Sequence, residues 1–162
     1  MVNDADQIAA AWMREAISLG REGMRANEGG PFGAVVVCSG KIVGRGCNQV
    51  TSTCDPTAHA EVLALRQACH SLGRFELRGC EIYASCEPCP MCLAAIYWAR
   101  LDKAYYGCSR QEAAAIGFDD DFIYTQMPLP ISQRSLPMEQ ISPNESRSLF
   151  EEWSAKPDKV PY

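Results

Sequence analysis

The hydrophobic positions follow first a helical and then a strand pattern near the start of the chain. Apolar or small residues recur every three to four positions over 4–26, which predicts a long helix with one buried stripe. Residues 32–38 are short, β-branched and almost continuously apolar, as in a strand buried on both faces. The Ser39-Gly40 pair is typical of a two-residue turn, so residues 41–47 are expected to return as the second strand of a hairpin.

The same patterns alternate through the middle of the chain. They predict helices over 56–72, 88–99 and 110–116, and strands over 80–85 and 103–108. Alternation of this kind favours helices on both faces of one sheet. We therefore expect an α/β fold, a three-layer α/β/α sandwich with a mixed central sheet of about five strands.

The composition changes after Tyr124. Six of the ten prolines lie between Pro128 and Pro161. Ser142-Pro143-Asn144-Glu145 resembles a capping box with proline at the first helical position, which predicts a last helix over about 143–155. Residues 135–141 carry a weak strand pattern. We expect one domain over 1–162, with 125–162 as a C-terminal arm.

Composition and charge narrow the class of protein. The 162 residues carry a net charge of −5, and the 15 Lys and Arg are scattered, which argues against a nucleic-acid partner. The sequence contains no run of about 18 apolar residues, so we expect no membrane span. We also expect no secretory signal, because the N-terminus lacks its pattern. The nine cysteines are an odd number, which indicates reduced thiols in a cytoplasmic protein.

Two short segments carry candidate metal ligands. Cys89 and Cys92 are three apart, so they share one helical face, and a helix N-terminus favours their thiolate forms. His59, from the preceding helix, would complete a set of three. Three protein ligands predict one catalytic Zn²⁺ per chain, because a structural site would use four and leave no position for water.

Glu61 is expected to lie beside this metal as the catalytic acid and base, taking a proton from water and passing it to a leaving amine. His59 and Glu61 are two positions apart, about 200° around an ideal helix. Both can border one site only if the site lies across the end of the helix.

Other interpretations of the thiols are weaker. A redox disulfide between Cys89 and Cys92 would have no use for the His-x-Glu segment. A purely structural zinc site would need a fourth ligand, for which Cys86 is the candidate. His70 lies about 16 Å further along the predicted helix, too far to join the site. The remaining cysteines are read as core or loop thiols.

The combined His-x-Glu and Pro-Cys-x-x-Cys pattern is typical of zinc deaminases. The chain resembles the cytidine-deaminase superfamily, in its histidine-ligand branch, up to about Tyr124. Within it, the chain is similar to bacterial guanine deaminases, whose reaction of guanine with water gives xanthine and ammonia. Five blocks of sequence carry this likeness: 29–35, 55–62, 85–92, 96–100 and 117–124. The first three are shared with tRNA adenosine deaminases, and the last two are more specific.

The resemblance implies a cytidine-deaminase-like fold and a small purine substrate. It implies that Phe32 and Trp98 pack on the faces of the purine, that Asn48 hydrogen-bonds it, and that Ala60 lines its site. Aromatic side chains suit a planar base. Phe32, Asn48 and Trp98 could equally serve only the core or a turn.

The resemblance also implies a second carboxylate, Asp120, that helps move protons at the leaving group. Asp119 and Asp121 flank it, and the sequence does not show which of the three faces the site. The C-terminal arm, ending in Tyr162, is expected to cover the pocket, and it can be swapped between subunits of a homodimer.

Three alternatives stay open. A tRNA adenosine deaminase would share the chemistry but would need basic surface for its RNA. A deaminase of guanosine or an aminotriazine would share the catalytic residues and differ in pocket volume. A non-catalytic zinc module would have no need of Glu61.

Overall fold

The computed structural model describes residues 4–118 and 120–162. The chain divides into two compact units, residues 1–121 and residues 122–162. The expected single domain with an arm over 125–162 stays a prediction. No described helix is long and apolar enough to cross a membrane.

The first unit alternates helices with strands. Its elements, in chain order, are α1 (Asp4–Arg25), β1 (Gly33–Cys38), β2 (Lys41–Cys47), α2 (Val50–Thr53), α3 (Ala60–Leu72), β3 (Cys80–Cys86), α4 (Pro90–Trp98), β4 (Lys103–Cys108) and α5 (Arg110–Ala115).

The sheet is mixed and has the strand order β2-β1-β3-β4. β1 pairs antiparallel with both β2 and β3, whereas β3 and β4 run parallel. The β1–β2 register shifts between Val36 and Val37. The described residues form four strands where about five were expected, and residues 135–141 form none.

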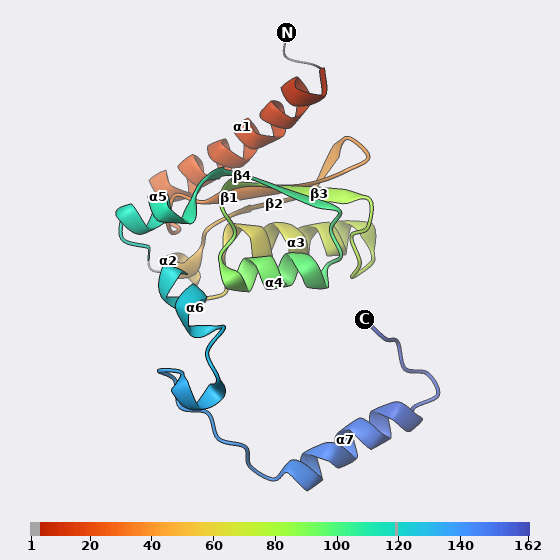
Figure 1. The fold of residues 1–162 in the computed structure, drawn as a ribbon. Helices are drawn as coiled ribbons and strands as arrows, with labels where there is room; N and C mark the ends of the chain where they lie inside the picture. The colour runs from red at the N-terminus through yellow and green to blue at the C-terminus, as the bar shows by residue number, and fades with distance from the viewer. Residues whose placement is uncertain (1–3, 119) are drawn as a thin grey trace. The chain divides into compact units, whose positions relative to one another are not determined.

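Helices cover the two faces of the sheet, as expected for a three-layer sandwich (Figure 1). α1 packs on one face, where Ala16, Val35 and Tyr83 are buried. α3 and α4 lie on the other face, over a larger core that includes Val36 and Ile82. Alternate residues of β1 therefore enter different cores, which explains why this strand is apolar on both faces.

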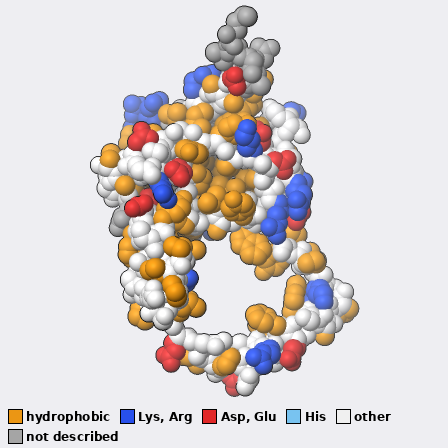
Figure 2. Space-filling model, in the orientation of Figure 1, with side chains coloured by type: hydrophobic (Ala, Val, Ile, Leu, Met, Phe, Trp, Pro, Cys, Tyr) orange, Lys and Arg blue, Asp and Glu red, His pale blue; other side chains and the backbone are white. Residues whose placement is uncertain are grey.

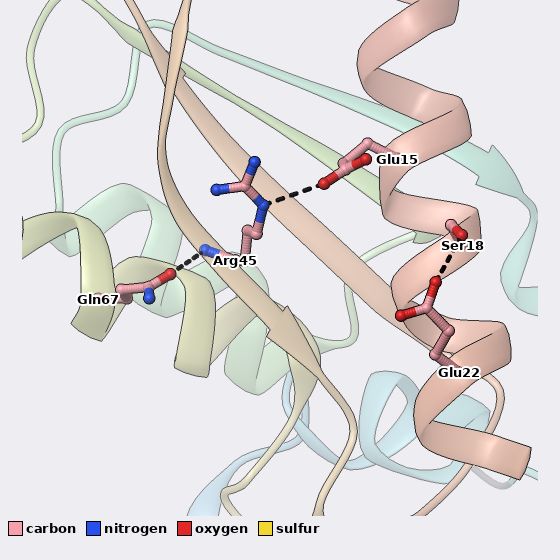
Figure 3. Close-up of polar contacts among 5 residues, drawn as sticks. All are labelled: Glu15, Ser18, Glu22, Arg45 and Gln67. Atoms are coloured by element: carbon pink, nitrogen blue, oxygen red, sulfur yellow. Dashed lines mark hydrogen bonds and ion pairs between the residues drawn. The ribbon is translucent and has the colours of Figure 1, made fainter. Parts of the chain in front are cut away.

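The edge strand β2 is tied to helices on both sides of the sheet (Figure 3). Arg45 Nε donates to Glu15 Oε1 of α1 at 3.0 Å, while its backbone N–H donates to Gln67 Oε1 of α3. The Arg45–Glu15 pair is exposed, so it contributes at most about 1 kcal/mol. The close approach of α3 to β2 has a different cause.

Two glycines of β2 let α3 lie directly against the strand. A Cβ on Gly46 would stand 2.2 Å from the Ala60 carbonyl oxygen, and one on Gly44 would stand 2.1 Å from that of Ala64. Real Cβ atoms essentially never come so close. The N-terminus of α3 can therefore pack against the end of β2 only because Gly44 and Gly46 have no side chains.

Two helix starts differ from expectation. α3 begins at Ala60 rather than at Pro56, because Pro56 and Thr57 form a turn and His59 has an extended backbone. α4 begins at Pro90 rather than at Pro88. Both expectations took proline as the first helical residue, whereas in the structure each helix begins only after a candidate ligand, His59 or Cys89, whose backbone is extended.

α6 (Asp120–Gln126) begins in the first unit and continues into the second. The second unit also contains η1 (Ile131–Gln133) and α7 (Pro143–Ala155). α7 matches the expected last helix, but the expected capping box is wrong, since Ser142 is left-handed and makes no capping hydrogen bond. α6 was not expected. Leu149, Phe150 and Trp153 of α7 are exposed.

Candidate metal centre

Two helix N-termini supply the candidate ligands. His59 is the residue immediately before α3, and Cys89 holds the same position before α4. Both have extended backbones and neither side chain caps its helix, so the imidazole and the thiol remain available. Cys92 lies in the first turn of α4 and is fully buried.

The three ligand atoms converge. His59 Nδ1 lies 3.6 Å from Cys89 Sγ and 3.5 Å from Cys92 Sγ. A tetrahedral zinc site with ordinary Zn–N and Zn–S bond lengths separates nitrogen from sulfur by about 3.6 Å. His59, Cys89 and Cys92 form the only such group that the described residues offer to a metal ion.

Glu61 lies beside this group. It is 7% exposed, and its Oε2 accepts a hydrogen bond from Cys92 Sγ at 3.5 Å. Burial raises the pKa of its carboxyl above the ordinary value. Because His59 precedes the helix and Glu61 is in its first turn, both face the end of α3, and the 200° separation of an ideal helix does not apply.

The two thiols differ as proton donors. The hydrogen bond from Cys92 is the largest cause that lowers the pKa of Cys89, to about 4, while the same bond raises the pKa of Cys92. The hydrogen bond to Cys89 raises the pKa of His59. Such a set shares its protons tightly, and a divalent cation would displace them, as thiolate ligation requires.

Asp120 begins α6 near this group. Its charge contributes to the raised pKa of His59, and burial raises the pKa of Asp120 itself. Asp120 Oδ1 is the one buried side-chain oxygen or nitrogen without a hydrogen-bond partner in the part of the chain that is described. Asp121 is exposed, and Asp119 lies outside the described residues.

Asn48 and Phe32 lie where β2 ends and β1 begins. Asn48 is 5% exposed, and its Oδ1 accepts hydrogen bonds from the backbone N–H groups of Gly30 and Val50, both at 3.2 Å. The amide oxygen is therefore committed to the loop, and the NH₂ group points its hydrogens elsewhere. Phe32 is half-buried and meets the ring of Phe118 edge to face, with centroids 4.6 Å apart.

The three remaining residues that are expected to contact the substrate, Ala60, Trp98 and Tyr162, differ in their burial. Ala60 is the first residue of α3 and is buried. Trp98 ends α4, about 9 Å along the helix from Cys92, and is 60% exposed. Figure 2 shows apolar side chains gathered on the surface over α4, where Tyr97 is exposed as well. Tyr162 belongs to the second unit and is exposed.

Phe118 was not singled out from the sequence. It follows Gly117, which has a positive φ, and the pair ends the turn after α5. A Cβ on Gly30 would stand 2.9 Å from the Phe118 ring, so the glycine makes room for it. The sequence signal for this contact is a glycine followed by an aromatic residue, but that pattern does not predict that Phe118 packs against Phe32.

Comparison with known proteins agrees with this geometry. The sequence profile of the cytidine and deoxycytidylate deaminase zinc-binding region matches residues 6–108, which include all three candidate ligands. The chain belongs to this family. His59, Cys89 and Cys92 fit the zinc that defines it, both in donor type and in spacing.

Several members of the deaminase family are similar over different lengths. A guanine deaminase of Bacillus subtilis is 47% identical over 93% of this chain and 97% of its own length. Its crystal structure has a TM-score of 0.92 over 94% of this chain and 98% of that chain. A tRNA-specific adenosine deaminase of Agrobacterium fabrum is 42% identical over 53% of this chain and 57% of its own.

Proposed function

We propose that the chain is a zinc-dependent guanine deaminase, which converts guanine and water into xanthine and ammonia in purine breakdown and salvage. The observation that carries the proposal is the buried Glu61 beside three zinc ligands in a chain that aligns with a guanine deaminase over nearly all of its length. The tRNA adenosine deaminase aligns with about half of the chain.

His59, Cys89 and Cys92 would hold one zinc ion. When bound, zinc supplies a Lewis acid that lowers the pKa of a water molecule enough to make it a nucleophile at neutral pH. Two thiolates and a neutral imidazole leave this centre with little net charge.

Glu61 is the proton carrier in this proposal. Its burial favours the neutral carboxyl, so a proton taken from the attacking water is held well until it is passed on. The proton goes to the amino group on C2 of guanine, which leaves as ammonia while the water oxygen stays on the ring. Asp120, whose Oδ1 has no partner among the described residues, is the second carboxyl that moves protons at this amino group.

Three groups would bind the purine. Phe32, held by the edge of Phe118, offers a ring face to the base. The NH₂ group of Asn48 is oriented by its own committed oxygen and can donate to a ring acceptor. The Ala60 N–H lies in the first turn of α3, where no carbonyl of the helix can accept its hydrogen bond.

The C-terminal arm completes the proposal. We infer a homodimer in which residues 125–162 cover the pocket, with Tyr162 and Trp98 packing on the base. The exposed apolar residues of α7 and the exposed aromatics of α4 support an interface for each. We also infer a cytoplasmic location, which the nine free thiols support.

The experiment is ammonia release by the zinc-loaded protein from guanine, guanosine, an aminotriazine and a tRNA anticodon stem, with Glu61→Gln as the blank. We expect release from guanine. Release only from guanosine, the aminotriazine or the RNA would retain the zinc chemistry and overturn the substrate.

A further inference from the structure

A second group of thiols lies at the opposite end of β3 from the metal centre. Cys80 begins this strand and Cys86 ends it, about 20 Å away. Cys38 is the last residue of β1 and lies directly opposite Cys80 in the antiparallel register. Directly opposed residues of antiparallel strands have Cα atoms about 4.5–5.5 Å apart, which is within the range that disulfides span.

The two side chains share one face of the sheet. Both pack with the core beneath α3, and Cys38 Sγ donates to the carbonyl oxygen of Gly79, the residue before Cys80, at 3.7 Å. Cys80 is fully buried, and burial is the main reason that its pKa is raised to about 11. Cys38 is half-buried beside the hairpin turn, so it is the thiol that a small molecule from solvent reaches first.

Arg74 places a cation on this pair. Its Nη2 donates to Cys80 Sγ at 3.6 Å and to Cys38 Sγ at 3.9 Å, and it is held by the Arg78 carbonyl oxygen at 3.0 Å. A guanidinium stabilises a thiolate, which is the reactive form of cysteine, and repels a metal ion. Arg74 therefore favours redox chemistry over metal binding at these thiols.

We propose that Cys38 and Cys80 are a redox modification site, which hydrogen peroxide or a similar peroxide converts into a reversible disulfide between β1 and β3. The Cys38 thiol attacks one peroxide oxygen, giving a sulfenic acid and one water. The Cys80 thiol then displaces the sulfenic hydroxyl, which leaves as a second water with the Cys80 proton. The two thiols lose two electrons and the peroxide gains them.

The disulfide would leave the catalytic centre unchanged. It joins strands that are already paired, so neither strand has to move. It closes a loop over residues 38–80, which contains His59 and Glu61, and a loop of this length restricts the unfolded chain strongly. The oxidised protein should therefore melt about 5–10 °C higher than the reduced protein.

The test is a titration of the reduced, zinc-loaded full chain with hydrogen peroxide. Thiol counting, non-reducing peptide mapping, bound zinc and melting temperature are followed together. We expect a loss of two thiols per chain, a peptide linked through Cys38 and Cys80, unchanged zinc and a raised melting temperature, all reversed by dithiothreitol.

Two variants sharpen this test. Cys38→Ser should abolish the linked peptide and the melting shift, whereas Cys54→Ser, which removes an exposed thiol, should retain both. Arg74→Gln should slow the oxidation, because it removes the cation that lies 3.9 Å from Cys38 Sγ and 3.6 Å from Cys80 Sγ. Oxidation confined to Cys89, Cys92 or exposed thiols, with no link between Cys38 and Cys80, would overturn the proposal. So would an unchanged melting shift in Cys38→Ser.

Discussion

His59 and Cys89 hold the same position in two different helices, each being the last extended residue before its helix begins, and His59 Nδ1 lies 3.6 Å from Cys89 Sγ. This relationship brings the N-termini of α3 and α4 together. The positive ends of two helix dipoles then favour the thiolates of Cys89 and Cys92. It also places Glu61, in the first turn of α3, at the same centre.

Glu61→Gln should separate zinc binding from catalysis. The amide has nearly the same shape but cannot carry a proton, so we expect ammonia release from guanine to fall by about 10²–10⁴-fold with zinc content unchanged. Metal analysis and a coupled ammonia assay on the same sample measure both. An active, zinc-loaded variant would show that another group carries the proton.

Cys89→Ala should lose both zinc and activity. Two ligands remain, and the buried Cys92 thiol then lacks the partner that shares its proton. Cys54→Ala is the matched control, since Cys54 is an exposed thiol. Removing zinc from the unaltered protein with a chelator should lower its melting temperature, because the metal binds the folded chain. Full zinc content in Cys89→Ala would exclude this thiol as a ligand.

Asp120→Asn should lower the turnover of guanine by about 10–10³-fold while zinc remains bound. The reason is that Asp120 Oδ1 is buried with no described partner, as expected for a group that meets the substrate. Asp121→Asn changes the neighbouring exposed carboxylate and should have little effect. Equal losses in the two variants would assign the effect to general charge rather than to Asp120.

Gly46→Ala should destabilise the protein by about 2–3 kcal/mol and weaken zinc binding. The added Cβ would meet the Ala60 carbonyl oxygen at 2.2 Å and push the start of α3 away from β2, moving His59 with it. At Gly40 there is open space and only a positive φ to oppose a side chain, so Gly40→Ala should cost about 1 kcal/mol and leave zinc binding intact. Urea unfolding and zinc titration compare the two, and equal effects on zinc affinity would contradict this account.

Stability should fall in alkaline solution because of buried thiols. The pKa of Cys80 rises from its ordinary 9.0 to about 11 in the folded protein, mainly through burial, with Cys38 and Arg74 beside it. Between these values the folded chain holds a proton that the unfolded chain has lost. Its contribution is therefore complete below about pH 9 and is lost as pH rises towards 11, by about 3 kcal/mol at most.

The measurement is urea unfolding of the zinc-loaded protein at several values between pH 8 and pH 11. Cys80→Ala should lose part of the pH dependence, and part should remain because burial also raises the pKa of Cys86 to about 11. Cys54→Ala should keep the full dependence. A profile in Cys80→Ala that is identical to the unaltered protein would show that Cys80 does not contribute.

Local patterns were sufficient for most of the fold. The apolar run of β1, the turn at Ser39-Gly40 and the helical spacing of α1 specify those elements, because each depends on the residue's own backbone preference and on the period of burial. The spacing of Cys89 and Cys92 likewise predicts a shared helical face. The type of metal site followed from residue chemistry alone.

Proline misled the prediction of where α3 and α4 begin. Pro56 and Pro88 suit the first turn of a helix by their own geometry, yet α3 begins at Ala60 and α4 begins at Pro90. The packing of Ala60 against Gly46, on a strand 14 residues away, sets the start of α3. No local preference encodes that contact.

The sequence by itself therefore determined most of the elements, the donor set and the role open to Glu61, because these depend on residue type and near spacing. Only the tertiary structure decided that His59 stands outside its helix, that Phe118 meets Phe32, and that Cys38 and Cys80 face each other beside Arg74. Each of these joins residues distant in the chain through sheet register or close packing. Such contacts are set by the fit of whole elements and not by the pattern within any one of them.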